Sequence, residues 1–88
     1  MLYIKQEARK DLDAPVYTLI RLIDKDYHAP GNLTYVLTKL LLGFLGEQYT
    51  FADIAETLGA LEATKLELYR RTVAPYENEK IKQNGDVF

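Results

Sequence analysis

The side chains best suited to chemistry lie together near the end of a long stretch with helical spacing. They are two tyrosines, two arginines and a lysine: Tyr69, Arg70, Arg71, Tyr76 and Lys80. Guanidinium groups bind phosphate through paired hydrogen bonds, and tyrosine rings stack on bases while offering a hydroxyl. This group is typical of a ligand-binding site for a nucleotide-like anion. The structural alternative is that Tyr69 is buried, Arg71 pairs with Glu67 and Arg70 is solvated.

The composition offers little for catalysis. The chain contains no Cys and no Ser, and no Gly-rich phosphate loop is present. Its single histidine, His28, cannot build a His-based metal site alone and is expected to lie in a loop. We therefore predict a protein that is not an enzyme, with no catalytic residues, no metal site and no cofactor.

Length and charge narrow the class of protein further. At 88 residues, the chain is expected to form one small domain over residues 1–88. A net charge of −2 argues against a nucleic-acid partner. No apolar run reaches the ~18 residues that a membrane span requires, and the N-terminus lacks a signal-peptide core. The prediction is a soluble protein of the cytoplasm with no membrane partner.

Apolar periodicity predicts an all-α fold of three to four helices. Two of them, over about residues 32–45 and 51–73, form a helical hairpin because the link between them is short. An N-terminal helix over about 14–25 is expected to pack across this hairpin. A short C-terminal helix is expected over about 75–82.

Capping residues set the expected ends of these helices. Thr50 with Asp53 three residues later is an acidic variant of the capping box. Asp13 is the expected N-cap of the first helix, with Pro15 near its first turn, and Asn32 is the expected N-cap of the second. Pro75 predicts a kink or stop in the long helix, and Asn84-Gly85 a C-terminal cap.

A row of small residues runs along one side of the long helix. Its members, at spacings of three and four, are Ala52, Ala55, Gly59 and Ala63. Glycine costs a helix roughly 1 kcal/mol relative to alanine, so Gly59 calls for a reason. Small residues allow another helix to approach closely, either from this chain or from a second copy. The alternative is that Gly59 is a tolerated surface residue. Since 48% of the residues are apolar, we predict a homo-oligomer with this row at its interface.

Several segments resemble a small uncharacterised family found in phages, prophages and some bacterial genomes. They are the runs Tyr3-Ile4-Lys5-Gln6-Glu7-Ala8-Arg9, Pro30-Gly31-Asn32-Leu33-Thr34-Tyr35-Val36-Leu37-Thr38, Tyr69-Arg70-Arg71, Ala74-Pro75-Tyr76-Glu77 and Asn84-Gly85-Asp86-Val87-Phe88. The closing segment is the most specific part of the resemblance. No activity and no functional residues are assigned to that family. The resemblance implies a phage-type accessory protein that acts in the host cytoplasm.

These observations lead to one functional hypothesis and two alternatives. The first is a homo-oligomer that sequesters a nucleotide-like signalling molecule and so blocks host defence, by analogy with helical sponges for cyclic dinucleotides or ADP-ribose derivatives. The second is a protein–protein interaction module that inhibits or adapts a host or phage protein through exposed Tyr and Leu residues. The third is an assembly helper of a virion or replication complex.

Overall fold

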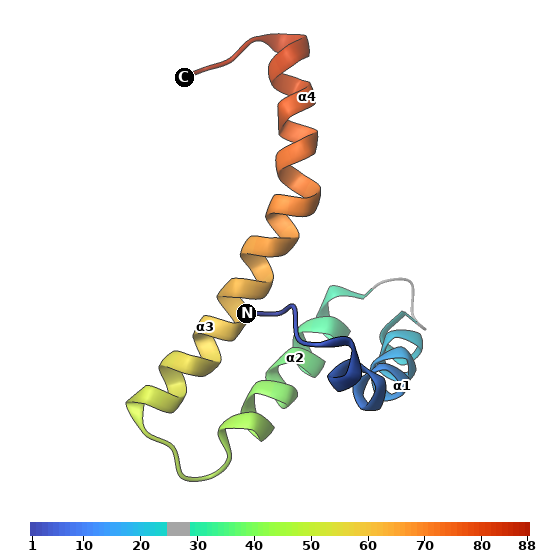
Figure 1. Cartoon of the computed structure of the whole chain (residues 1–88), viewed down its shortest axis with the longest axis vertical. Coiled ribbons are helices and arrows are strands. Elements are labelled where there is room, and N and C mark those ends of the chain that lie inside the picture. The colour runs from blue at the N-terminus through green and yellow to red at the C-terminus, as the bar shows by residue number, and fades with distance from the viewer. Residues whose placement is uncertain (25–28) are drawn as a thin grey trace.

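The computed structural model describes residues 1–24 and 29–88. This part of the chain consists of helices and irregular segments and contains no strands (Figure 1). The predicted all-α class is therefore confirmed. The elements are α1 (Gln6–Ile23), α2 (Pro30–Leu45), α3 (Phe51–Leu68), a π-helical turn η2 (Tyr69–Val73) and α4 (Ala74–Asn84). His28 and the expected helix end at Lys25 lie outside the described residues.

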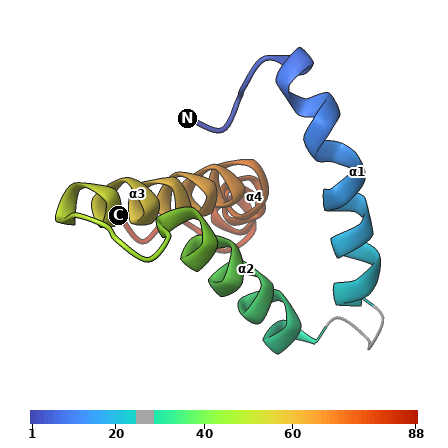
Figure 2. The same cartoon turned by 90° about the horizontal axis from the view of Figure 1, so that it is seen from below.

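The helices α2 and α3 form the predicted antiparallel hairpin, and α3 continues through η2 into α4 as one long bent rod (Figure 1). Seen from below, α1 approaches α2 near its own end and then diverges from it, and it lies well away from α3 (Figure 2). The first helix therefore does not pack across the hairpin as the sequence predicted. The N-terminal arm before α1 turns back towards α3, where the Tyr3 hydroxyl donates to Glu67. The radius of gyration is 16.9 Å, against about 12 Å for a compact domain of this length. The subunit is therefore open and extended.

The hairpin begins its second helix at the predicted residue. Thr50 Oγ1 accepts a hydrogen bond from the backbone N–H of Asp53 (3.3 Å), and the Thr50 N–H donates to Asp53 Oδ2 (2.9 Å). Two of the N–H groups that a helix start leaves without partners are thereby satisfied. The carboxylate also lies near the positive end of the helix dipole. The capping prediction is confirmed.

The first helix begins earlier than the sequence pattern predicts. It starts at Gln6 rather than Ala14, so Asp13 is no N-cap and Pro15 lies inside the helix. Proline removes one helical hydrogen bond, which would run to the carbonyl of Asp11. Asp11 is exposed, so water can satisfy that carbonyl. The arm also supports the early start, because Arg9 Nε donates to the Ile4 carbonyl oxygen (2.9 Å).

The second helix also begins before its expected cap. Pro30 is its first residue and Ala29 takes the N-cap position, so Asn32 lies inside the helix. Proline suits this place because its fixed φ is helical and its missing N–H would have had no partner. Asn32 Nδ2 instead donates to the carbonyl oxygen of Ile23 (3.4 Å). That hydrogen bond ties the start of α2 to the end of α1.

Pro75 bends the long helix without ending it. Immediately before it the chain forms η2, and the N–H of Ala74 donates to the Tyr69 carbonyl oxygen. A π-helical turn adds one residue to the helical repeat, and such insertions are a usual cause of bends. α4 then runs to Asn84, beyond the predicted end near residue 82, and Gly85 closes it at φ +89°. A glycine adopts this left-handed conformation without the clash a Cβ would cause.

The open shape leaves the described part of the chain without a hydrophobic core. Among the described residues, no apolar side chain is buried, and the one buried residue is Thr57, at 3% exposure. The accessible surface is 8134 Å², whereas a compact protein of 10.1 kDa exposes about 5,300 Å². The excess is therefore close to 3,000 Å².

We expect Thr50→Ala to lower the free energy of unfolding by about 1 kcal/mol, because it removes the side-chain half of the capping box. Urea unfolding followed by circular dichroism measures this. Thr64→Ala is the matched control: its hydroxyl donates only to the Ala60 carbonyl oxygen in the exposed middle of α3, and alanine favours a helix there. Equal effects of the two substitutions would contradict the capping assignment.

Candidate functional site

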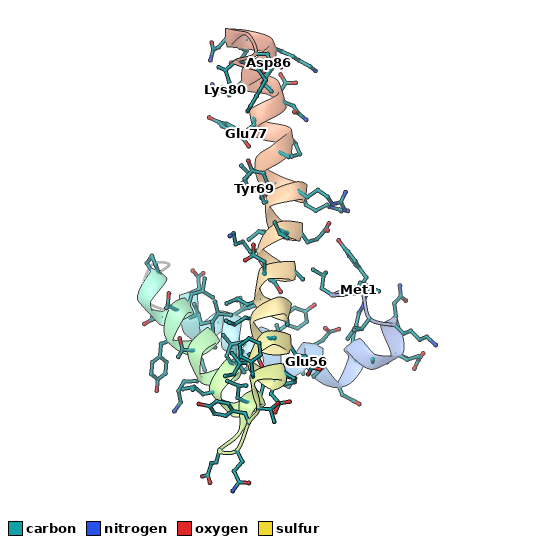
Figure 3. All side chains as sticks on the ribbon, turned by 90° about the vertical axis from the view of Figure 1, so that its left-hand side faces the viewer. Met1, Glu56, Tyr69, Glu77, Lys80 and Asp86 are labelled. Atoms are coloured by element: carbon teal, nitrogen blue, oxygen red, sulfur yellow. The ribbon has the colours of Figure 1, made fainter. Side chains whose placement is uncertain are left out.

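The five predicted ligand-binding residues all lie on the part of the rod formed by η2 and α4. Tyr69, Glu77 and Lys80 project from the same side of it (Figure 3). The contacts nevertheless divide the five residues into separate groups. Arg70 bonds back towards α3 and the N-terminal arm, Tyr69 bonds along the rod, and Lys80 lies over Tyr76.

The π-helical turn brings Tyr69 and Glu77 together. Residues eight apart on a regular α-helix lie about 80° apart around the axis, whereas residues seven apart lie nearly in line. One inserted residue lets the pair eight apart behave as if it were seven apart. The Tyr69 hydroxyl accordingly donates to Oε1 of Glu77. This hydrogen bond, and the negative charge behind it, raises the pKa of Tyr69 above its usual value.

Arg70 is held by a carboxylate of its own subunit. Its Nε lies 3.0 Å from Oε1 of Glu67, which also accepts a hydrogen bond of 3.0 Å from the Tyr3 hydroxyl. The hydrogen bond from Arg70 lowers the pKa of Glu67 and is the largest influence on it, and the same contact raises the pKa of Arg70. The positive charge of Arg70 is thus largely neutralised within the subunit.

The alternative interpretation, in which Tyr69 is buried and Arg71 pairs with Glu67, also differs from the structure. The partner of Glu67 is Arg70, three residues on, rather than Arg71, four residues on. Tyr69 is half-exposed and not buried. Arg71 is exposed and makes no ion pair within residues 1–24 and 29–88, so it is the arginine of this group that is open to an external anion.

Tyr76 and Lys80 line a shallow groove at the end of the rod. The ammonium of Lys80 lies 5.6 Å from the centre of the Tyr76 ring, within the range of a cation–π contact. The groove has a volume of about 430 Å³, and its other wall is the tail after α4, Gly85–Phe88. Val87 and Phe88 are fully exposed there. The groove therefore joins two of the five predicted residues and leaves out the arginines and Tyr69.

The predicted interface residues also lie on the surface of the subunit. Ala52, Ala55 and Gly59 are exposed, and Ala63 is half-buried. A Cβ placed on Gly59 would meet no atom within 4 Å. α2 packs instead against the side of α3 that carries Thr57. No close approach among the described residues accounts for Gly59, so a contact with a second copy and a tolerated surface position are the two explanations that remain.

An apolar surface on α2 was not predicted as a site. Leu40, Leu41 and Phe44 form a groove of about 330 Å³ with Thr57 and Ala60 of α3. The sequence signal for it was present, because the repeat of leucines along α2 is plain. Periodicity assigns such a face to a core, and it cannot tell whether the residues that cover it belong to the same chain.

Within the described ranges, no three His, Cys, Asp or Glu side chains come together as metal ligands would. No helix among them is both long and apolar enough to cross a bilayer.

A family comparison matches residues 1–87, nearly the whole chain, to a domain of unknown function, DUF6899. The chain belongs to this family. The DUF6899 match carries no assigned activity, so the roles of the residues above rest on geometry alone. Neither a curated protein nor a solved structure matches the chain.

The Glu67 contacts make a prediction about pH. Because the folded-state pKa of Glu67 is lowered from 4.5, its stabilising contribution is present above that value and is lost as the pH falls through the lowered pKa. An NMR titration of the Glu67 carboxyl measures this. We expect Arg70→Ala to raise the pKa markedly, Tyr3→Phe to raise it less, and the neighbouring control Arg71→Ala to raise it least. A larger rise from Arg71→Ala than from Arg70→Ala would refute the assignment.

Proposed function

We propose that this chain is a non-enzymatic, homo-oligomeric interaction protein, whose subunits complete their hydrophobic core by association. The observation that carries the proposal is that no apolar side chain among the described residues is buried. Burial of apolar surface is the main favourable term in folding, and it must offset the conformational entropy of ordering the chain. An isolated subunit of this shape cannot meet that requirement.

The amount of exposed surface supports an obligate assembly rather than a transient one. The excess of close to 3,000 Å² per subunit compares with about 800 Å² per partner in a standard interface. Obligate homodimers bury 2,000–5,000 Å² in total and have more apolar interfaces. The exposed residues are of the right kind, since most of the exposed large apolar side chains on α2 and α3 are leucines. For a phage-type accessory protein, the same surfaces suit an assembly that docks on a host or phage protein.

Native mass spectrometry and sedimentation velocity of the full chain test the proposal. We expect masses that are multiples of 10.1 kDa at micromolar concentration. Since association couples to folding, the thermal midpoint should rise with protein concentration. A single folded subunit at all concentrations, with a midpoint independent of concentration, would overturn the proposal. Stoichiometric retention of a protein from a host lysate would add a second partner to it.

A second candidate function is sequestration of a nucleotide-type anion by the assembled protein. It is favoured by two separate features, the open guanidinium of Arg71 outside the groove and the Lys80–Tyr76 pair that lines the groove beside the tail. An ammonium on an aromatic ring offers both charge and a stacking surface to such a ligand. Arg70 and Tyr69 already bond to Glu67 and Glu77. They would bind the ligand only if those hydrogen bonds were first broken.

Calorimetric titration with cyclic dinucleotides and ADP-ribose derivatives tests this second candidate. If Arg71 makes a buried charge-assisted contact, we expect Arg71→Ala to weaken binding by roughly 2 kcal/mol, about 30-fold. Lys65→Ala is the control, because Lys65 pairs with Glu62 on α3, away from the groove. Flat titrations with every ligand would remove the candidate, as would equal losses from the two substitutions.

A further inference from the structure

One face of α2 carries four large apolar side chains that nothing in the described chain covers. Its members recur at spacings of four, three and four, and they are Leu33, Leu37, Leu40 and Phe44, which we call the α2 stripe. Their exposed fractions include 55% at Leu40 and 74% at Phe44. A continuous row of this length on a soluble protein marks a surface that is covered by a partner.

The neighbours of the α2 stripe show which way it faces. On one side of the stripe lie Asn32, which bonds to the carbonyl oxygen at the end of α1, and Val36, one turn further along. On the other side lies Leu41, which is half-buried and meets Thr57 and Ala60 of α3. The stripe therefore faces into the angle between α1 and α3. Figure 2 looks into this angle, where the two helices diverge from α2.

The part of this angle that lies between α2 and α3 is apolar and offers no unpaired polar group to a ligand. The groove formed by Leu40, Leu41 and Phe44 against α3 contains a single side-chain hydroxyl, that of Thr57. This hydroxyl already donates to the Asp53 carbonyl oxygen (2.8 Å). None of the buried side-chain nitrogen or oxygen atoms in the described residues lacks a hydrogen-bond partner. An occupant of the angle must therefore bring apolar side chains.

α1 adds a second unpartnered apolar face on the same chain. Leu12 and Val16 are exposed, and Leu19 and Ile23, which continue the row at helical spacing, are only half-buried. Each subunit thus presents both a receiving surface, on α2 and α3, and helices with matching apolar rows. Two copies related by a twofold axis can each cover the other with the same set of residues.

We propose that the angle between α1 and α3 is filled by the apolar helices of a second copy, with the α2 stripe at the centre of the contact. This inference rests on the proposed homo-oligomer and specifies the surface that forms it. The partner must be present whenever the chain is folded, because the subunit alone buries no apolar side chain among its described residues. A second copy is the one partner that every molecule of the protein has at hand. The area exposed in excess by one chain is larger than the roughly 1,000–2,500 Å² that each partner buries in an obligate homodimer, so the surface is sufficient for such a contact.

This contact differs from the one expected at the row of small residues. Successive residues of an α-helix are ~100° apart around its axis, so Gly59 lies about 160° from Thr57 on α3. The angle opens on the Thr57 side, where Ala60 and the α2 stripe meet. The small-residue row faces the opposite side. Substitutions on one surface therefore leave the other unchanged, so experiments can tell the two contacts apart.

Sedimentation velocity of the full chain and three variants tests the proposal. Leu40→Glu places a charge on the α2 stripe. Leu42→Glu is the matched control, since Leu42 lies two residues away on the opposite face of the same helix with 58% of its side chain exposed, against 55% for Leu40. Glutamate and leucine have similar helix propensities, so neither variant disturbs α2 itself. Gly59→Leu probes the small-residue row.

We expect Leu40→Glu to raise the dissociation constant of the assembly by about 30-fold or more, the size typical of a central interface residue. Leu42→Glu should leave it within a few-fold of the parent chain. An assembly that survives Leu40→Glu but dissociates on Gly59→Leu or Leu42→Glu would overturn the surface while keeping the homo-oligomer. A parent chain that is a single subunit at every concentration would instead overturn the proposed function itself.

A cross-linking variant keeps the proposal testable if Leu40→Glu fails to fold. The chain contains no cysteine, so one introduced at Leu40 or at Leu42 is the only thiol in the molecule. Under mild oxidation of the assembled protein, we expect Leu40→Cys to form a disulfide-linked dimer faster than Leu42→Cys. Equal rates, or faster linking through position 42, would contradict a central α2 stripe.

Discussion

The helices of this chain carry more apolar surface than their contacts with one another can bury, and this excess determines the main properties of the structure. Three helices can enclose a core only if they converge, and here α3 runs on through η2 and α4 while α1 stands away from it (Figures 1 and 2). Within residues 1–24 and 29–88, the contact of α2 with α3 around Thr57 is the one place where a residue becomes buried. Every other apolar row on the described helices is at least partly exposed. The proposed assembly follows from this shortage of internal contacts.

The rod is the second feature that shapes the surface. Pro75 does not end this helix, which continues as α4 to Asn84. Instead, the π-helical turn before Pro75 bends the helix, and this accommodates the hydrogen bond that proline cannot donate. The same turn sets Tyr69 against Glu77, while Arg71 within it makes no ion pair in the described chain. Continuity of the rod therefore decides both the exposed area and the charges available near its end.

Local contacts also decide which of the chemically capable side chains are open. Arg70 and Tyr69 attract attention in the sequence because of their types, yet each is held by a glutamate of the same chain. A charge that is already paired offers an external anion less than its residue type suggests, since binding must first break the pair. Lys80 and Arg71 have no such carboxylate partner among the described residues. An anion is therefore more readily met by these two residues than by the cluster as a whole.

The sequence by itself determined the helices, because the signals for them are local. The Thr50–Asp53 capping box, the leucine repeat of α2 and the closing Gly85 each act within a turn or two of chain, and each lies in the structure where it was predicted. The sequence could not place the start of α1. A proline tolerated inside a helix and a proline in the first turn give the same local signal until the surroundings of Pro15 are known. Only the tertiary structure decided that Glu67 pairs with Arg70 and Tyr3, and that the α2 stripe is left uncovered. The reason is that apolar spacing specifies a face to be buried, whereas the partner of that face depends on contacts between residues far apart in the chain.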